Sequence, residues 1–270
     1  MPQPPESEPL VGRRKELAAL AQALHARVPL LIHGPADAGK TFLVRRLLDS
    51  LPPEDRDSCV YVPGFISIHA LLQSVARQLF LPHTRPGGPR GRDAGPQAGS
   101  ARAIQSSTSG RLRLLLRDAV RERRLCLILD HAPRFSPALA RLAQEWLWRD
   151  DSCVWLLARG KTRDEIGYAW SLYYTPELRL HVGRLPEREA EILFERCLRR
   201  FSLAALDSQE LRAGVLRLSR GLPGAIVKMC AMAVEPRYHY GRRVKLRLMH
   251  VDYLMQGIST QRAAHMGAGQ

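Results

Sequence analysis

The residues with the clearest chemical meaning form one short segment near the start of the chain. Gly34-Pro35-Ala36-Asp37-Ala38-Gly39-Lys40-Thr41 matches the pattern GxxxxGK(S/T). In this pattern the glycines let the backbone close around a phosphate, and successive N–H groups place partial positive charge on it. We expect Lys40 to reach the β and γ phosphates, the Thr41 hydroxyl to take a magnesium position, and Phe42 to add a contact. The segment predicts a site for a nucleoside triphosphate with Mg²⁺.

Two polar residues at the ends of apolar runs are further candidates. Asp130 follows the run 125–129, where a carboxylate would orient a magnesium ion through its water shell; alternatively, it only caps a helix or begins a turn. Arg159 follows the run 153–158 and would sense a γ-phosphate, because ligands of open α/β folds lie at the carboxyl ends of the strands. The alternative is an ordinary surface arginine.

The elements that must position these residues alternate along the chain. Short apolar runs bounded by turn residues predict buried strands at 28–33, 59–62, 125–129, 153–158 and 178–182. Amphipathic segments between them predict helices, among them 68–80, 111–123 and 136–148. Fully apolar strands that alternate with helices favour an α/β fold, with a parallel sheet covered on both faces to give three layers.

The domain organisation follows from changes in composition. We expect a flexible tail over 1–8, a nucleotide-binding domain over 9–184, a C-terminal all-helical lid domain over 185–257 and a flexible tail over 258–270. Residues 82–110 are dense in Gly, Pro, Ser and Arg, so we expect a flexible basic insertion there. This insertion would either follow a nucleic acid or be a tolerated loop.

The composition excludes several classes of protein. With 270 residues and 45% hydrophobic residues, the chain can build a core, and no apolar run approaches the roughly 20 residues of a membrane-spanning helix. The N-terminus has no basic start or apolar stretch of signal-peptide length, so we expect a cytoplasmic protein with no membrane partner. The five scattered cysteines favour buried reduced thiols over disulfides or zinc. No Ser/His/Asp or Cys/His arrangement supports a protease.

The charge balance leaves two interpretations open. The 41 basic residues against 26 acidic ones give a formal charge of +15, which favours binding to a polyanion such as DNA. Only five of the basic residues are lysines, a bias that a GC-rich coding sequence produces without selection for binding. Residues 237–247 place Tyr238 and Tyr240 among basic side chains, which suits backbone contacts with DNA and some base stacking. The alternative is a solvated helix face with a core stripe of Val244, Leu246, Leu248, Val251 and Leu254.

Five motifs give the chain a family resemblance. PLVGRRKEL, GPADAGKT, LCLILD, WLLAR and GLPG occur in this order. In this respect the chain resembles P-loop ATPases of the AAA+ and STAND group, above all the initiator-like and transposition-helper ATPases that act on DNA. The resemblance covers about residues 9–235 and implies a P-loop NTPase sheet with a helical lid, with ATP and Mg²⁺ as cofactors.

The resemblance also implies roles for individual residues. Val11, Gly12 and Arg13 would lie near the adenine, the loop 34–41 would hold phosphates and magnesium, and the motif 221–223, with Pro223, would close the lid. Asp130 would be the strand-end acid and Arg159 the sensor. An arginine finger would come from a neighbouring subunit of a homo-oligomer, with Arg149 and Arg163 as candidates.

One departure from the family pattern bears on activity. Family members usually carry a second acidic residue after the magnesium aspartate to polarise the attacking water, and this chain has His131 there. A histidine can serve as a base. Two functions therefore stay open: an ATP hydrolase that assembles and acts on DNA in transposition, recombination or replication, or a STAND-like nucleotide-gated switch that signals to partner proteins with little turnover.

Overall fold

The computed structural model describes residues 10–81, 101–147 and 153–266 and divides them into two compact units. The sheet unit comprises 19–34 and 40–181, apart from the gaps in the described ranges. The helical unit comprises 10–18, 35–39 and 182–266. Residues 35–39 of the nucleotide loop thus belong to the helical unit, whereas Gly34 and Lys40 at its two ends belong to the sheet unit.

The sheet unit is built on a five-stranded parallel sheet with the order β2-β3-β4-β1-β5, which confirms the predicted α/β class. The strands are β1 (Leu30–Gly34), β2 (Cys59–Val62), β3 (Cys126–Ala132), β4 (Cys153–Arg159) and β5 (Arg179–His181). Since β1 lies between β4 and β5, and β3 lies beside β4, the ends of β1, β4 and β3 are neighbours at the carboxyl edge.

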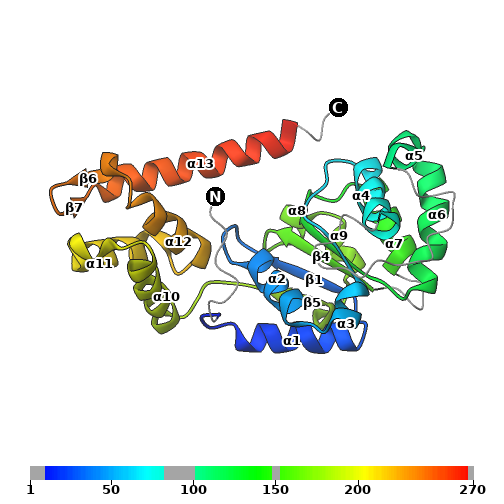
Figure 1. Ribbon diagram of the computed structural model, residues 1–270, viewed down its shortest axis with the longest axis horizontal. Helices are drawn as coiled ribbons and strands as arrows, with labels where there is room; N and C mark the ends of the chain where they lie inside the picture. Colours follow the sequence, from blue (N-terminus) through cyan, green and yellow to red (C-terminus); the bar gives the residue numbers. More distant parts are fainter. Residues whose placement is uncertain (1–9, 82–100, 148–152, 267–270) are drawn as a thin grey trace. The chain divides into compact units, whose positions relative to one another are not determined.

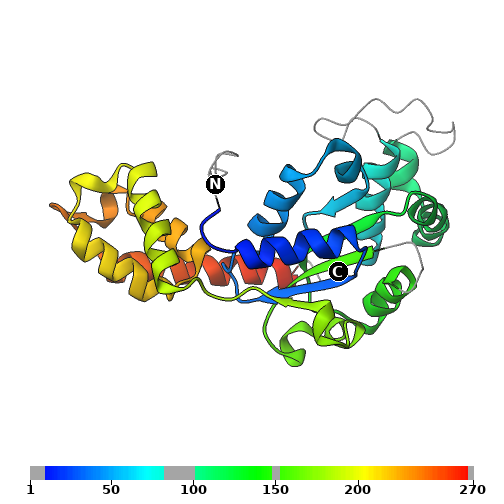
Figure 2. The same cartoon turned by 90° about the horizontal axis from the view of Figure 1, so that it is seen from below.

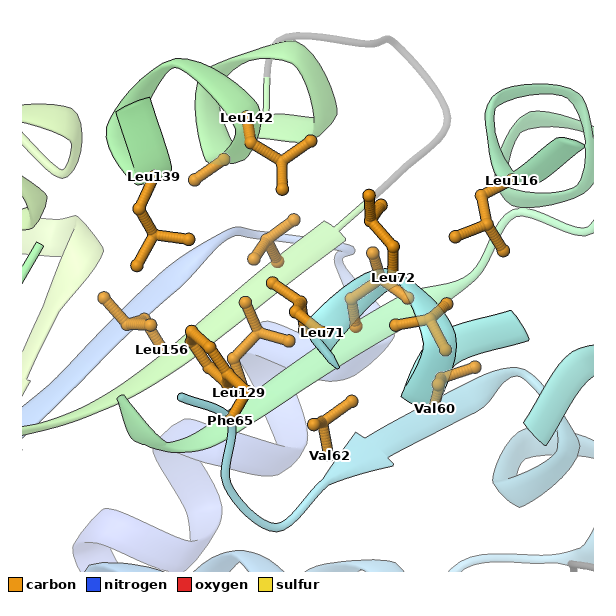
Figure 3. Packing of buried hydrophobic residues seen from close by; sticks show 14 of the residues in the cluster. Val60, Val62, Phe65, Leu71, Leu72, Leu116, Leu129, Leu139, Leu142 and Leu156 are labelled. Atoms are coloured by element: carbon orange, nitrogen blue, oxygen red, sulfur yellow. The ribbon is translucent and has the colours of Figure 1, made fainter. Parts of the chain in front are cut away.

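Alternate residues of the strands point to opposite faces of the sheet, and both faces are buried. On one face, the strand residues Val60, Leu129 and Leu156 pack with side chains from α4 (Ile68–Phe80), α6 (Ser109–Glu122) and α7 (Pro137–Leu147), as Figure 3 shows. Helices α1 (Arg14–His25) and α2 (Lys40–Ser50) lie on the other face (Figures 1 and 2). This is the predicted three-layer arrangement.

The remaining short elements of the sheet unit are α3 (Pro53–Asp57), α5 (Ala101–Ser106), α8 (Arg163–Ile166), α9 (Ala169–Leu172) and η2 (Pro176–Leu178). Helix α5 corrects part of the expected flexible insertion at 82–110. Its Ile104 is only 3% exposed and joins the main core, so this apolar side chain anchors the segment. Residues 82–100 of that expected insertion lie outside the described residues.

The helical unit has its own hydrophobic core, which includes Phe194, Val215, Met229 and Met249. Its elements are α10 (Glu187–Arg200), η3 (Leu203–Ala205), α11 (Ser208–Ser219), α12 (Pro223–Met232), η4 (Pro236–Tyr238), β6 (His239–Tyr240), β7 (Arg243–Val244) and α13 (Leu246–Met266).

Two features of the helical unit differ from the sequence expectation. Strands β6 and β7 form a small antiparallel hairpin where only helices are expected, and Gly241 supplies the positive φ of +58° at its turn. Helix α13 continues to Met266, whereas a flexible tail is expected from 258.

All five cysteines are buried free thiols. Within the described ranges, no helix combines the length and the apolar character needed to cross a membrane.

Candidate functional site

The nucleotide loop connects the end of β1 to the start of α2, as the motif requires. Strand β1 ends at Gly34 and α2 begins at Lys40. Between them, Asp37 and Gly39 have φ values of +60° and +89°, in the left-handed region where a non-glycine residue is strained. The ammonium group of Lys40 donates a hydrogen bond of 2.9 Å to the Gly34 carbonyl. The loop therefore folds back on itself next to the N-terminus of an eleven-residue helix, an arrangement that favours anions.

The sheet brings three of the predicted residues to the same edge. Gly34 and Arg159 are register partners at the ends of β1 and β4, and Asp130 lies on β3, the next strand. Arg159 is exposed, while Thr41 and Phe42 occupy the first turn of α2, Phe42 being 38% exposed. The edge of the sheet thus combines Gly34, where the loop begins, with an acid and an arginine.

Asp130 is a buried carboxylate, and it lies at a β-bulge that changes the direction of the side chains in this part of β3. It is 2% exposed, and the register between β3 and β4 shifts between Leu129 and Ala132. His131, inside this bulge, has a φ of +48°, so its backbone N–H turns back and donates to Asp130 Oδ1 at 2.7 Å. Bulges of this kind occur next to active sites because they redirect a side chain.

Tyr61 is a residue of this site that the sequence analysis missed. Its hydroxyl donates a hydrogen bond of 2.5 Å to Asp130 Oδ2. Burial, together with the neighbouring Asp130 carboxylate, raises the pKa of Tyr61 above its ordinary value. The guanidinium of Arg45, on α2, lies 5.4 Å from the centre of the Tyr61 ring. A polar residue in an otherwise apolar strand was the signal in the sequence.

His131 itself points toward solvent. Its side chain is 71% exposed, and its Nε2 lies 4.0 Å from Asp130 Oδ2. It is therefore next to the strand-end acid, at the position where the family usually carries a second acidic residue.

His33, the residue before the loop, is a second site residue not expected from the sequence. It is 7% exposed, and its ring lies 5.2 Å from Trp170 and 5.0 Å from His181, between centroids. Its Nδ1 is buried and has no hydrogen-bond partner among the residues that the structure describes. Burial lowers the pKa of His33, and the charges of His181, Arg179 and Lys40 act in the same direction, against an opposing hydrogen bond with the Gly160 backbone.

In the helical unit, the middle of the loop is held by helix residues. Both carboxylate oxygens of Asp37 are occupied, Oδ1 by the ammonium of Lys228 and Oδ2 by the hydroxyl of Tyr253, each at 2.7 Å. The Gly224 N–H donates to the Asp37 carbonyl at 2.8 Å. A Cβ atom on Gly39 would lie 3.4 Å from Pro223 Cγ, so the predicted motif around Pro223 does contact the loop.

Of the predicted adenine-side residues, Arg13 contacts the loop. Gly12 and Arg13 both have positive φ, and the Arg13 guanidinium donates to the carbonyls of Ala38 and Gly183 and pairs with Glu16 at 2.7 Å. Val11 precedes them and is partly buried. Arg13 thus bridges the main chain of the loop, at Ala38, and the main chain at Gly183.

The remaining predicted residues are not brought to the loop by any described contact. Arg149 lies outside the described residues, and Arg163 is exposed at the start of α8. Within 237–247, Tyr238 is fully buried and donates to Asp252 at 2.8 Å, so the expectation that it stacks on bases is wrong. Tyr240, at the hairpin, is 77% exposed.

Comparison with solved structures supports the same fold. The Walker-type ATPase PABY2304 of Pyrococcus abyssi has a TM-score of 0.61 at 15% identity, covering 95% of this chain and 75% of that one. Cdc6p from Pyrobaculum aerophilum has a TM-score of 0.52 at 18% identity, with 85% and 64% covered.

Sequence comparison identifies the family. No curated protein sequence matches the chain. The sequence model of the AAA ATPase domain matches residues 9–152, more than half of the chain. This match agrees with the resemblance to P-loop ATPases of the AAA+ and STAND group. The chain belongs to the AAA ATPase domain family.

Proposed function

We propose that the chain binds ATP with Mg²⁺ at the loop 34–41 and hydrolyses it slowly. The observation that carries this proposal is the loop itself, which runs from β1 into α2 with Asp37 and Gly39 in the left-handed region. Its backbone N–H groups, the start of α2 and the Lys40 ammonium supply the positive charge that a triphosphate requires.

The residues at the strand edge fit a magnesium ion. Asp130 is a buried carboxylate whose partners in the described part of the chain are a hydroxyl, a backbone amide and the His131 imidazole at 4.0 Å. None of these is a permanent cation, and oxygen donors are the ligands that Mg²⁺ prefers. Thr41 and Asp130 would hold the ion, which when bound would neutralise charge on the phosphate oxygens.

Hydrolysis requires a group that accepts a proton from the attacking water. The water oxygen forms a bond to the γ-phosphorus, and the bond from that phosphorus to the β–γ bridging oxygen breaks. We assign the proton acceptor to His131, because its imidazole lies beside Asp130. Lys40 and Arg159 would stabilise the negative charge that is transferred to the phosphates.

Action on DNA by an assembled oligomer is the cellular role we propose for this ATPase. The formal charge of +15 supports it, as does the hairpin β6–β7, where Tyr240, Arg242 and Arg243 line a surface hollow. An exposed tyrosine among arginines suits stacking and phosphate contacts. The family resemblance to initiator-like and transposition-helper ATPases points the same way.

A nucleotide-gated switch with partner proteins is the second candidate. One specific observation favours it: the residue in place of the second acid, His131, has a side chain that is 71% exposed. An exposed imidazole is poorly fixed against the attacking water, so bound ATP would persist and its conformational effect would be the signal.

Calorimetry and turnover assays test these proposals. We expect wild type to bind ATP in the presence of Mg²⁺, Lys40→Ala to bind at least about tenfold more weakly, and Lys161→Ala, which removes an exposed lysine outside the loop, to bind as wild type. Absence of any heat with ATP on folded wild type would make the binding proposal wrong.

The turnover assay separates the two candidates. We expect His131→Ala to lower kcat by about 100-fold while ATP affinity is retained, since a general base contributes a factor of this size. Wild-type turnover no higher than that of Lys40→Ala would indicate a contaminant. Tight ATP binding with a kcat that His131→Ala leaves unchanged would favour the switch.

A further inference from the structure

Tyr61 and Asp130 come from neighbouring strands and meet on the same face of the sheet. Tyr61 on β2 is the register partner of Ile128 on β3, two residues before Asp130. Since alternate residues share a face, Tyr61, Ile128 and Asp130 project to the side that carries α2. A tyrosine side chain is long enough to reach two residues further along the neighbouring strand, where its hydroxyl meets the carboxylate.

The two hydrogen bonds of Asp130 fix the orientation of its carboxylate. Tyr61 donates to Oδ2 at 2.5 Å, and the His131 backbone N–H donates to Oδ1 at 2.7 Å. One donor on each oxygen prevents rotation of the group, while each oxygen keeps further capacity to accept. A hydrogen bond to a charged acceptor in a buried setting is strong, so this orientation is well defined.

Arg45 connects this pair to the helix that follows the nucleotide loop. Its guanidinium lies 5.4 Å from the centre of the Tyr61 ring, and it belongs to α2, whose first turn contains Thr41. The ring is thus held from the helix side and the hydroxyl from the strand side. The two residues expected to hold magnesium, Thr41 and Asp130, are linked through Arg45 and Tyr61.

We propose that Tyr61 is a positioning residue for the divalent cation: its hydroxyl sets the carboxylate of Asp130 in the orientation in which it orders the ion. The inference rests on the proposed function, because it requires a cation at Asp130. Residues that orient metal ligands usually change metal affinity by 10- to 100-fold when removed. On this proposal Tyr61 acts on the cation and not on the phosphates, which the loop would hold.

The test measures ATP affinity by calorimetry with Mg²⁺ and with EDTA, together with Mn²⁺ affinity by electron paramagnetic resonance in the presence of a non-hydrolysable ATP analogue. For Tyr61→Phe we expect ATP affinity in EDTA to equal that of wild type, and Mn²⁺ affinity to fall by about tenfold. In an Asp130→Asn background, the same substitution should have no further effect on Mn²⁺ affinity.

Two control variants separate positioning from folding. Tyr173→Phe removes another buried hydroxyl, which donates to the Val154 carbonyl, and is expected to leave Mn²⁺ affinity unchanged. Arg45→Met keeps the Tyr61 hydroxyl but removes the cation over its ring. We expect its Mn²⁺ affinity to fall below that of wild type, but by less than about tenfold. This comparison is with wild type and can be made even if Tyr61→Phe does not fold.

The outcomes distinguish this inference from the proposed function. If wild type binds ATP equally with Mg²⁺ and EDTA and binds no Mn²⁺, the magnesium site of the proposed function is wrong. If Asp130→Asn lowers Mn²⁺ affinity but Tyr61→Phe behaves like Tyr173→Phe, the magnesium site stands and the role of Tyr61 is overturned. An equal loss of ATP affinity in EDTA and in Mg²⁺ would also overturn it, because the hydroxyl would then be structural.

Discussion

His33 shows how burial changes the chemistry of one side chain beside the nucleotide loop. It is 7% exposed, and its Nδ1 has no hydrogen-bond partner within the described part of the chain. His181, Arg179 and Lys40 place further positive charge nearby. Each of these conditions opposes protonation, which is why the pKa of His33 is lowered. The neutral imidazole is thus the form compatible with this fold.

The lowered pKa of His33 predicts a loss of stability in acid. Unfolded histidine takes up a proton at about pH 6.5, whereas folded His33 does so only at lower pH. Below about pH 6.5 the unfolded state binds more protons than the folded state. The free energy of unfolding therefore decreases as the pH is lowered, by at most about 1.4 kcal/mol per pH unit. We expect His33→Gln to reduce this slope in denaturant unfolding between pH 7.5 and 5.5.

The control for this prediction is His25→Gln, which changes an exposed histidine in the last turn of α1. Its slope should match that of wild type. Equal slopes for wild type and His33→Gln would contradict the prediction.

At the scale of elements, α12 holds the nucleotide loop through one ion pair. Lys228 contacts Asp37 at 2.7 Å, and the two side chains are 35% and 18% exposed. Pro223 and Gly224, at the start of the same helix, pack against the loop main chain. Phosphate binding in the loop is therefore expected to influence α12 directly.

We expect Lys228→Met to destabilise the protein by about 1 kcal/mol, the upper end for exposed pairs, because this pair is only partly exposed. For a chain of this size, that is a decrease in the thermal midpoint of about 3 °C. The loss should be smaller in high salt, where part of the attraction is already screened.

A matched pair within the same unit provides the control. Arg212 and Glu191 lie 2.9 Å apart, but their side chains are 44% and 37% exposed. Arg212→Met should therefore cost less than about 0.5 kcal/mol. If both substitutions lower the thermal midpoint equally, the Lys228–Asp37 pair stabilises the protein no more than the exposed Arg212–Glu191 pair.

At the scale of the whole molecule, the excess of arginine is either a binding surface or a compositional bias. The hairpin β6–β7 distinguishes the two, since it places Tyr240, Arg242 and Arg243 beside one another on the surface. Arg243 is 72% exposed, although Glu210 lies 3.6 Å away. A bias in the coding sequence would give every exposed arginine the same small effect.

We expect the protein to bind random-sequence duplex DNA more tightly with ATP than without it, and less tightly as salt rises. The plot of log affinity against log salt concentration has a negative slope. Its magnitude should decrease by about one in Arg242→Ala and by about one in Arg243→Ala, as for side chains that contact phosphates. Fluorescence anisotropy at several salt concentrations measures this slope.

Arg188→Ala, at an exposed position of α10, is the control for the DNA prediction and should leave the slope unchanged. If all three substitutions have the same effect, compositional bias explains the charge. Absence of binding at low salt would remove the DNA role and favour the switch.

Local patterns determined most of the elements. The apolar runs at 59–62 and 153–158 are strands β2 and β4, because strands of a parallel sheet covered on both faces are largely apolar. The loop 34–41 was recognisable because glycine and lysine positions fixed by phosphate chemistry occur at set spacing. Helix α5 and the hairpin β6–β7 were missed because Ile104 and Gly241 are single residues in polar segments, too few for a periodic signal.

The sequence by itself therefore determined the fold class, the nucleotide loop and the candidate acid Asp130. Only the tertiary structure decided what surrounds them: Tyr61 on the Asp130 carboxylate, His33 between Trp170 and His181, and Lys228 on the loop. The physical reason is the separation in sequence of the residues that contact one another. A motif records contacts between residues close together in the chain, whereas these contacts join residues 69 to 191 positions apart, which only strand order and helix packing bring together.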